Sequence, residues 1–157
     1  MSQNRFKPFG VVNLLLRRND EVLLAQRINQ GWEDGNYGII SGHLEGEETA
    51  TEAIIREAKE ELNISLAPEH LNVVHVMHRY SNRENIDITF ECRTWRGSIA
   101  NMEPLKCGDI AFFPHWKLPT NITPFVPFLL DQVKKGNVYS EYGFDLVQQN
   151  KKDTIFF

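Results

Sequence analysis

The chain has 157 residues, of which 41% are hydrophobic, and a formal net charge of −4 at pH 7. This length predicts one domain over residues 1–157, and the hydrophobic content is sufficient for a buried core. The acidic balance argues against a general nucleic-acid binder, which needs a basic face. No apolar run approaches the roughly 18 residues of a membrane span, and no signal-peptide core is present, so we expect a cytoplasmic protein.

The first half of the chain predicts strands followed by a helix. Apolar, β-branched residues around the turn signal Asn19-Asp20 are typical of two paired strands. Further on, apolar residues recur at helical spacing, which predicts a helix with one buried stripe. The expected elements are strands at 10–17 and 22–26, a glycine-rich loop at 28–38, a short apolar piece at 39–40 and a helix at 49–62.

The second half predicts more strands and a second helix. Apolar and polar residues alternate from Ile86 onward, the pattern of a strand with one wet face. The tail from Asn137 has no assignment. Strands followed by a helix, twice over, favour a mixed sheet flanked by helices. The expected elements are strands at 71–80, 86–95 and 107–113 and a helix at 125–135.

Acidic residues gather on the first predicted helix. Glu57, Glu60 and Glu61 are spaced i, i+3 and i+4, so they share one helical face. Carboxylates crowded in this way repel one another unless a cation lies between them. Hard divalent metals such as Mg²⁺ or Mn²⁺ take oxygen ligands and suit metal-assisted phosphate chemistry. A solvated face is the alternative, in which Glu52 and Arg56 form an i, i+4 pair.

Residues 42–64 resemble the signature of the Nudix (MutT-like) hydrolase family, in which glycine, glutamates and an arginine stand at fixed distances. The family's last glycine is replaced by Asn63, which tolerates the left-handed conformation that commonly ends a helix. The loop before the box also departs from the family, with Ile39-Ile40-Ser41 in place of Leu-Pro-Gly. The matching positions are Gly42, Glu48, Arg56, Glu57, Glu60 and Glu61.

The resemblance implies the Nudix fold, an α/β/α sandwich around a central mixed β-sheet. It also implies that Glu57, Glu60 and Glu61 hold Mg²⁺ (or Mn²⁺), with a backbone carbonyl from Gly42 as a further ligand. Arg56, paired with Glu48, would orient these groups.

The general base has two candidates, Glu57 within the box and Glu103 in a later loop. Residues 101–107 contain Glu-Pro-Leu-Lys-Cys, which is similar to a segment of Nudix diphosphatases that cleave nucleoside triphosphates. The alternative for Glu103 is a solvated loop acid before a proline.

A nucleotide site needs an aromatic face for the base and cations for the phosphates. Each aromatic candidate is more often a core residue, and each cation is more often a free surface group. Cys92 and Cys107 lack metal or disulfide spacing and are expected to be free thiols. The substrate-binding candidates are Arg27, Tyr37, His43 and Phe113, with Trp32 and Trp116 as further aromatic residues.

Together these features predict Mg²⁺-dependent hydrolysis of a phosphoanhydride bond. The expected substrate is a small nucleotide, a (deoxy)nucleoside triphosphate cleaved to monophosphate and pyrophosphate. Alternatives are a sugar nucleotide, a dinucleoside polyphosphate, ADP-ribose or a pterin triphosphate, or a nucleotide-binding module without turnover. We expect neither a nucleic-acid polymer nor a membrane as partner, and the family resemblance allows a homodimer.

Overall fold

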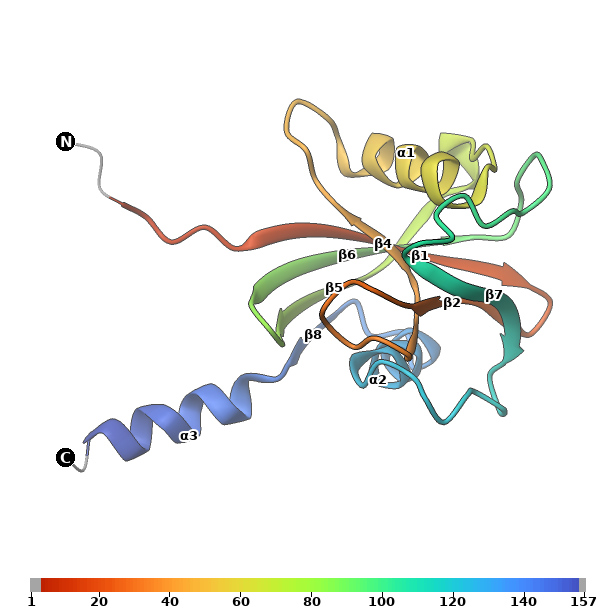
Figure 1. The fold of residues 1–157 in the computed structure, drawn as a ribbon. Helices are drawn as coiled ribbons and strands as arrows, with labels where there is room; N and C mark the ends of the chain where they lie inside the picture. The colour runs from red at the N-terminus through yellow and green to blue at the C-terminus, as the bar shows by residue number, and fades with distance from the viewer. Residues whose placement is uncertain (1–3, 156–157) are drawn as a thin grey trace.

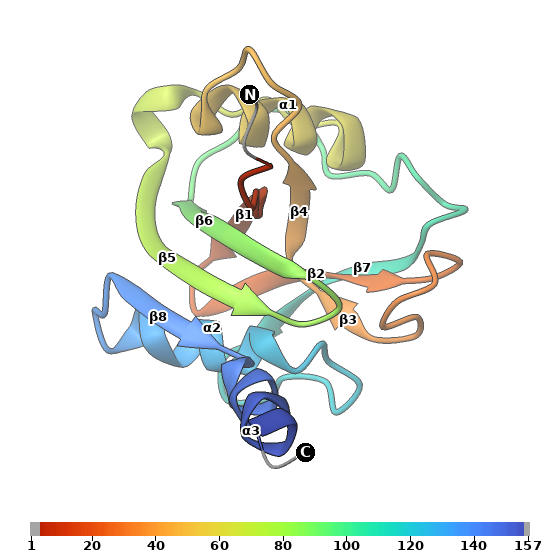
Figure 2. The ribbon, with the colours of Figure 1, turned by 90° about the vertical axis from the view of Figure 1, so that its left-hand side faces the viewer.

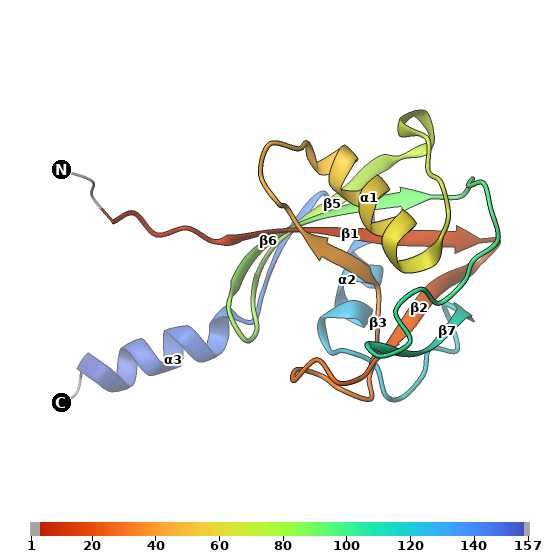
Figure 3. The ribbon, with the colours of Figure 1, turned by 45° about the horizontal axis from the view of Figure 1, so that its top comes forward.

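The computed structural model describes residues 4–155, so residues 1–3 and 156–157 of the predicted domain lie outside it. A central mixed sheet separates helix α1 (Ala50–Leu62) above it from α2 (Phe125–Lys134) below it (Figure 1). This arrangement confirms the predicted α/β/α sandwich around a central mixed sheet. A third helix, α3 (Phe144–Ile155), projects from the body on the same side as the N-terminal segment, as Figures 1 and 3 both show.

The sheet has the strand order β3-β2-β1-β6-β5-β8, while β4 pairs with β1 and β7 pairs with β2. The β1–β6 and β5–β8 pairs are parallel and the others are antiparallel. Figure 2 shows β4 running from the β3 end of the molecule up to α1. The strands are β1 (Phe9–Arg18), β2 (Glu21–Arg27), β3 (Tyr37–Gly38), β4 (Ile40–His43), β5 (Asn72–Tyr80), β6 (Glu84–Cys92), β7 (Cys107–Pro114) and β8 (Tyr139–Tyr142).

Side chains along β1 alternate between two separate hydrophobic clusters, as the pleat of a strand requires. Leu14 and Leu16 belong to the cluster that contains the buried residues of α1. Leu15 belongs to the cluster that contains the buried residues of α2. A strand buried on both faces reads as a continuous apolar run, which explains why β1 is visible in the sequence.

Helix α1 begins and ends with local capping interactions. Thr49 accepts a hydrogen bond from the backbone N–H of Glu52, and the Glu52 carboxylate accepts one from the backbone N–H of Thr49. This capping box engages Glu52, so the expected Glu52–Arg56 pair is wrong. Asn63 ends the helix at φ 59° and ψ 30°, the left-handed conformation predicted for it.

Three parts of the fold differ from the sequence-based expectation. Strand β3 is only two residues long and lies in the predicted loop, because its pairing with β2 and a bridge from Tyr37 to Ile122 are long-range contacts. Strand β6 ends at Cys92 rather than at Trp95. The unassigned tail contains β8 and α3, and β8 depends on parallel pairing with β5, which local sequence does not report.

The cysteines and the helix lengths bear on two of the sequence-based expectations. Cys92 and Cys107 are both free thiols, which confirms their predicted state. Over residues 4–155, no helix is long and apolar enough to cross a membrane.

Candidate active site

Gly42 brings strand β4 into close contact with helix α1. A Cβ atom at this position would lie 2.0 Å from Oε1 and 2.1 Å from Cδ of Glu57. Both distances are far below any van der Waals contact, so a side chain here would displace the glutamate. Glycine is therefore needed at residue 42 because the Glu57 carboxylate occupies the space beside the backbone.

Arg56 ties the helix to the loop that precedes it. Its guanidinium donates hydrogen bonds to Glu48 (Nη2–Oε1 2.8 Å), Glu57 (Nη1–Oε1 2.8 Å) and the carbonyl of His43 (3.2 Å). A longer contact reaches Glu60 at 3.3 Å. The bond to Glu48 is the main cause that raises the pKa of Arg56, and it lowers the pKa of Glu48. The predicted Glu48–Arg56 pair is confirmed, and it fixes the entrance to α1.

The carboxylates behind Arg56 are buried and close together. Burial is the largest cause that raises the pKa of Glu61 to about 9, followed by the charge of Glu57, with which it also shares a hydrogen bond. Burial likewise raises the pKa of Glu57. The charges of Glu103 and Glu60 raise the Glu61 pKa further. The structure thus brings the later loop acid Glu103 to the acids of the helix.

This acid cluster suits a divalent cation chemically. Glu61 and Glu103 line a small cavity of about 70 Å³, which is also lined by Ile40 and Ser41 of β4. Among the described residues, no three acidic, histidine or cysteine side chains already surround one point as metal ligands. Glu60 is 53% exposed and contacts Arg56 instead. The hard oxygen donors fit Mg²⁺ or Mn²⁺, whose charge would offset the burial and the repulsion that together raise the Glu61 pKa.

Two predicted substrate-binding residues, Tyr37 and Phe113, lie against each other. Their ring centroids are 5.0 Å apart in an edge-on arrangement. The Tyr37 hydroxyl donates a 2.6 Å hydrogen bond to Asp109, which raises the pKa of Tyr37 to about 12. Both rings pack against the hydrophobic cluster of α2. Trp116 is 76% exposed and lines neither the small cavity beside Glu61 nor the larger cavity described below.

Arg27 lies between the acid cluster and a second, larger cavity. It lines the small cavity beside Glu61, and its Nε donates a 2.9 Å hydrogen bond to the carbonyl of Trp32. Its guanidinium stands 5.1 Å from the Trp32 ring centroid, a cation–π distance. Burial lowers the pKa of Arg27. Arg27 therefore borders the carboxylates on one side and contacts Trp32 of the β2–β3 loop on the other.

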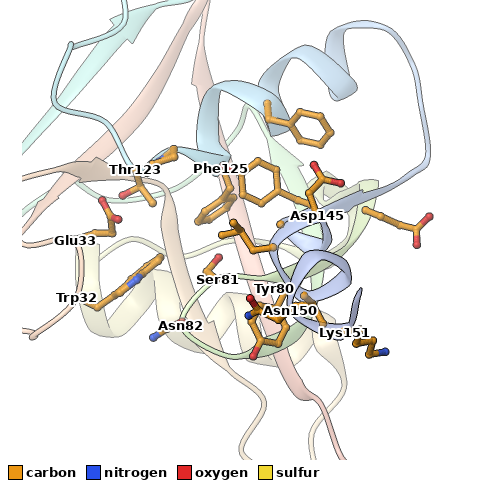
Figure 4. A pocket seen from close by; sticks show the side chains of 17 residues that line it. Trp32, Glu33, Tyr80, Ser81, Asn82, Thr123, Phe125, Asp145, Asn150 and Lys151 are labelled. Atoms are coloured by element: carbon orange, nitrogen blue, oxygen red, sulfur yellow. The ribbon is translucent and has the colours of Figure 1, made fainter. Parts of the chain in front are cut away.

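The larger cavity has a volume of about 1270 Å³ and opens between the β2–β3 loop, α2, the β5–β6 turn and α3. Figure 4 shows Trp32 and Glu33 on one side, Tyr80 and Asn150 on the other, and Phe125 between them. Such an aromatic lining suits a flat ligand.

A buried arginine stands behind these aromatic residues. Arg79 lies 4.2 Å from the Phe125 ring centroid and 6.0 Å from that of Trp32. It is held by Asp87 through Nε at 2.5 Å and Nη2 at 3.2 Å, and by the Ser81 hydroxyl. The ion pair is almost fully buried, so it fixes the arginine in place beneath the cavity.

Buried polar atoms without partners lie on the sheet face opposite α1 and next to the start of α2. Three buried side-chain atoms have no hydrogen-bond partner in the described part of the chain: Asn13 Oδ1, Asn85 Nδ2 and Thr123 Oγ1. Buried polar groups are nearly always satisfied, so each requires an explanation. Sequence reasoning missed all three residues. The only signal was an asparagine at position 13 inside an otherwise apolar strand.

The comparisons with known proteins identify the family. The family model for the NUDIX domain matches residues 7–133. The chain belongs to the Nudix family, which confirms the resemblance seen in residues 42–64.

Two curated relatives match part of the chain. The NAD-capped RNA hydrolase NudC of Photorhabdus laumondii is 43% identical over 51 residues, which are 32% of this chain and 19% of that protein. The CTP pyrophosphohydrolase of Escherichia coli is 36% identical over 58 residues, which are 37% of this chain and 43% of that protein. The alignments thus span less than half the length of either relative.

The fold is also found among solved structures. The crystal structure of a MutT NUDIX hydrolase from Burkholderia pseudomallei aligns with a TM-score of 0.75. The alignment covers 82% of this chain and 99% of that chain at 22% sequence identity. At this identity the similarity shows that the two proteins share a fold, so function has to be argued from the site.

Proposed function

We propose that this protein hydrolyses a nucleoside triphosphate to a monophosphate and pyrophosphate with Mg²⁺ (or Mn²⁺) as cofactor. The observation that carries the proposal is the pairing of two neighbouring sites. One is a buried cluster of carboxylates beside Gly42, and the other is an aromatic cavity that Arg27 and Trp32 connect to it. Metal-binding acids next to a flat, apolar pocket match the two ends of a nucleotide.

Glu57, Glu60 and Glu61 are the proposed metal ligands, with the Gly42 carbonyl as a further one. A divalent cation bound there would neutralise phosphate oxygens and lower the pKa of a water. Arg56 positions Glu57 and the His43 carbonyl through its hydrogen bonds. The protein thereby supplies orientation, and orientation is a large part of catalysis in phosphoryl transfer.

Two acids remain candidates for the base that takes the proton of the attacking water. Glu57 is already engaged by Arg56, while Glu103 borders the small cavity of about 70 Å³ beside Glu61. That volume is enough for a water molecule. Comparing Glu103→Gln with Glu57→Gln tests the choice, because loss of a base alone lowers kcat without weakening metal affinity.

The nucleobase is proposed to bind against Trp32 and Phe125, with the fixed Arg79 behind them. Base stacking on an aromatic ring contributes about 1–3 kcal/mol per base in single-stranded nucleic-acid sites, which gives a scale for this contact. Similarity to a CTP pyrophosphohydrolase over 58 residues supports a nucleotide of this kind. The base itself is to be identified by experiment.

A dinucleoside polyphosphate or another nucleotide with a second large group is the second candidate. The cavity of about 1270 Å³ exceeds the roughly 300–1,000 Å³ of most small-molecule sites. A substrate with a second nucleoside would use that additional room.

One screen decides between these substrates. The purified chain is incubated with Mg²⁺ and a panel of nucleoside triphosphates, dinucleoside polyphosphates, sugar nucleotides and ADP-ribose, and the products are separated by chromatography. We expect monophosphate and pyrophosphate from at least one triphosphate. The Glu57→Gln variant, prepared in parallel, controls for contaminating phosphatases. Binding of nucleotides without any turnover, at saturating Mg²⁺ or Mn²⁺, would contradict the proposal.

A further inference from the structure

Arg83, in the turn between β5 and β6, has no carboxylate partner within ion-pair distance among the described residues. The two acids nearest to it in sequence are both engaged, since Glu84 pairs with His78 at 3.1 Å and Asp87 pairs with Arg79. The Arg83 guanidinium instead lies 4.1 Å from the ring centroid of Phe9. An arginine that is held in position yet lacks an anion is a candidate for binding one.

The guanidinium of Arg83 meets an imidazole nitrogen rather than an acid. Its Nη2 contacts Nε2 of His43, the residue after Gly42. In this contact the imidazole is neutral and accepts through a bare Nε2. With the proton on Nε2 instead, both the imidazole and the guanidinium would donate to a charged oxygen. The Arg83 guanidinium and the His43 imidazole thus contact each other directly, and no carboxylate among the described residues offsets the charge of Arg83.

Asn85 adds a third donor to this group. Its Oδ1 accepts a 3.1 Å hydrogen bond from Nε of Arg83, while its Nδ2 has no partner among the described residues. The side chain is 1% exposed, so its amide N–H lacks water as well. A buried donor left unsatisfied costs about 1–3 kcal/mol, and an anionic oxygen at this point would remove that cost.

The strand register places two of these donors, His43 and Asn85, on one face of the sheet. Phe9 pairs with Asn85, and Val11 pairs with His43, so all four side chains lie on the same face, opposite α1. Ser81 and Asn82, just before Arg83, line the large cavity. Arg83 therefore directly follows residues that line the cavity proposed for the base, and His43 directly follows Gly42 of the proposed metal site.

We infer that Arg83, His43 and Asn85 form a binding site for the α-phosphate of a nucleotide. The inference rests on the proposed function, because the α-phosphate is the group that joins the nucleoside to the scissile anhydride. A phosphate here would accept hydrogen bonds from a guanidinium, an imidazole and an amide. Its contacts come from residues of the chain alone, so the site binds a monophosphate without metal.

The test measures binding in EDTA by titration calorimetry. The probes are the four nucleosides adenosine, guanosine, cytidine and uridine and their 5′-monophosphates. Wild-type protein is expected to bind at least one monophosphate about 10-fold or more tighter than its nucleoside, as a charge-assisted contact would give. Arg83→Gln should reduce that preference to within about threefold, and Arg83→Lys should retain part of it.

Arg93→Gln is the matched control, because Arg93 lies just past the other end of β6 and pairs with Glu91 at 3.6 Å. It should keep the wild-type preference. Equal preference in wild type and Arg83→Gln, or no preference in wild type, would overturn the site. Triphosphate turnover with Mg²⁺ is measured separately on wild type. Its absence would count against the proposed function, while the metal-free phosphate preference still decides this inference.

Discussion

The two faces of the sheet beside β4 carry opposite chemistry. On the α1 side, Glu57 and Glu61 are buried acids whose pKa values are raised. On the other side, Arg79 is buried beneath the aromatic cavity and Arg83 lacks a carboxylate partner among the described residues. A nucleotide also has two unlike ends, and the division of the protein into an acidic face and a donor-rich face matches them.

The two faces also differ in how they are built. Apart from Glu103, the acids follow one another within residues 42–61, and a single helix with its preceding loop positions them. The opposite face combines side chains from β1, β4, β5, β6 and the start of α2, which are far apart in sequence. Substitutions on the first face should therefore disturb catalysis, and those on the second should disturb affinity for the nucleotide.

Glu60→Gln is expected to have the largest effect. The side chain is 53% exposed, so its loss of charge should leave the fold intact. Removing one proposed metal ligand forfeits several kcal/mol of charge stabilisation, which corresponds to a loss of about 1,000-fold in turnover. Steady-state kinetics with saturating Mg²⁺ measures it. Glu52→Gln, on the same helix, is the control, because glutamine preserves the capping box. Near-normal activity of Glu60→Gln would refute its assignment as a ligand.

Gly42→Ala should follow, with a loss of about 100-fold in turnover. The added methyl would lie 2.0 Å from Oε1 of Glu57 and must push that carboxylate away. Displacement of a catalytic group by about 1 Å is sufficient for an effect of this size. Gly38→Ala is the matched control, since its Cβ would meet only Thr123 Oγ1 at 3.5 Å, an ordinary contact. If both variants lose activity equally, the cause is general strain and not Glu57.

Trp32→Ala tests the other face and should act on binding. We expect KM for the substrate to rise roughly 10-fold with kcat nearly unchanged, because stacking of about 1–3 kcal/mol is uniform between ground and transition state. Kinetics on the best substrate of the screen measures both constants. Trp116→Ala, an exposed tryptophan at 76%, should leave both unchanged. A fall in kcat with constant KM would show that Trp32 acts in the chemical step, and the assignment of binding to one face and catalysis to the other would then be wrong.

The contrast between a locally built face and one assembled from distant strands also explains which features the sequence predicted. Helix α1 was predicted with its boundary near Thr49 and its left-handed end at Asn63, because caps and spacing are local properties. Strand β3 and the unsatisfied Asn85 depend on pairings across the sheet, which no short window of sequence contains. Glu103 was visible only through a segment resemblance, and its approach to Glu61 requires the folded loop.

The last expected effect is on stability and not on turnover, a pH-dependent gain from Mg²⁺. The pKa of Glu61 is raised from 4.5 to about 9 in the folded protein, chiefly by burial. The folded state therefore keeps a proton that the unfolded state releases above pH 4.5, so without metal this group lowers stability as pH rises toward about 9. A divalent cation displaces that proton, and its benefit should grow over the same window.

Thermal unfolding with EDTA or with Mg²⁺, between pH 5 and about 9, checks this expectation. Each kcal/mol of added stability shifts the midpoint by roughly 2–4 °C for a chain of this size. Glu61→Gln carries no titrating group at this position, so it should lose both the downward slope in EDTA and most of the Mg²⁺ gain. A variant that kept the full Mg²⁺ gain would show that the cation binds elsewhere, and the acidic face would then lose its proposed role.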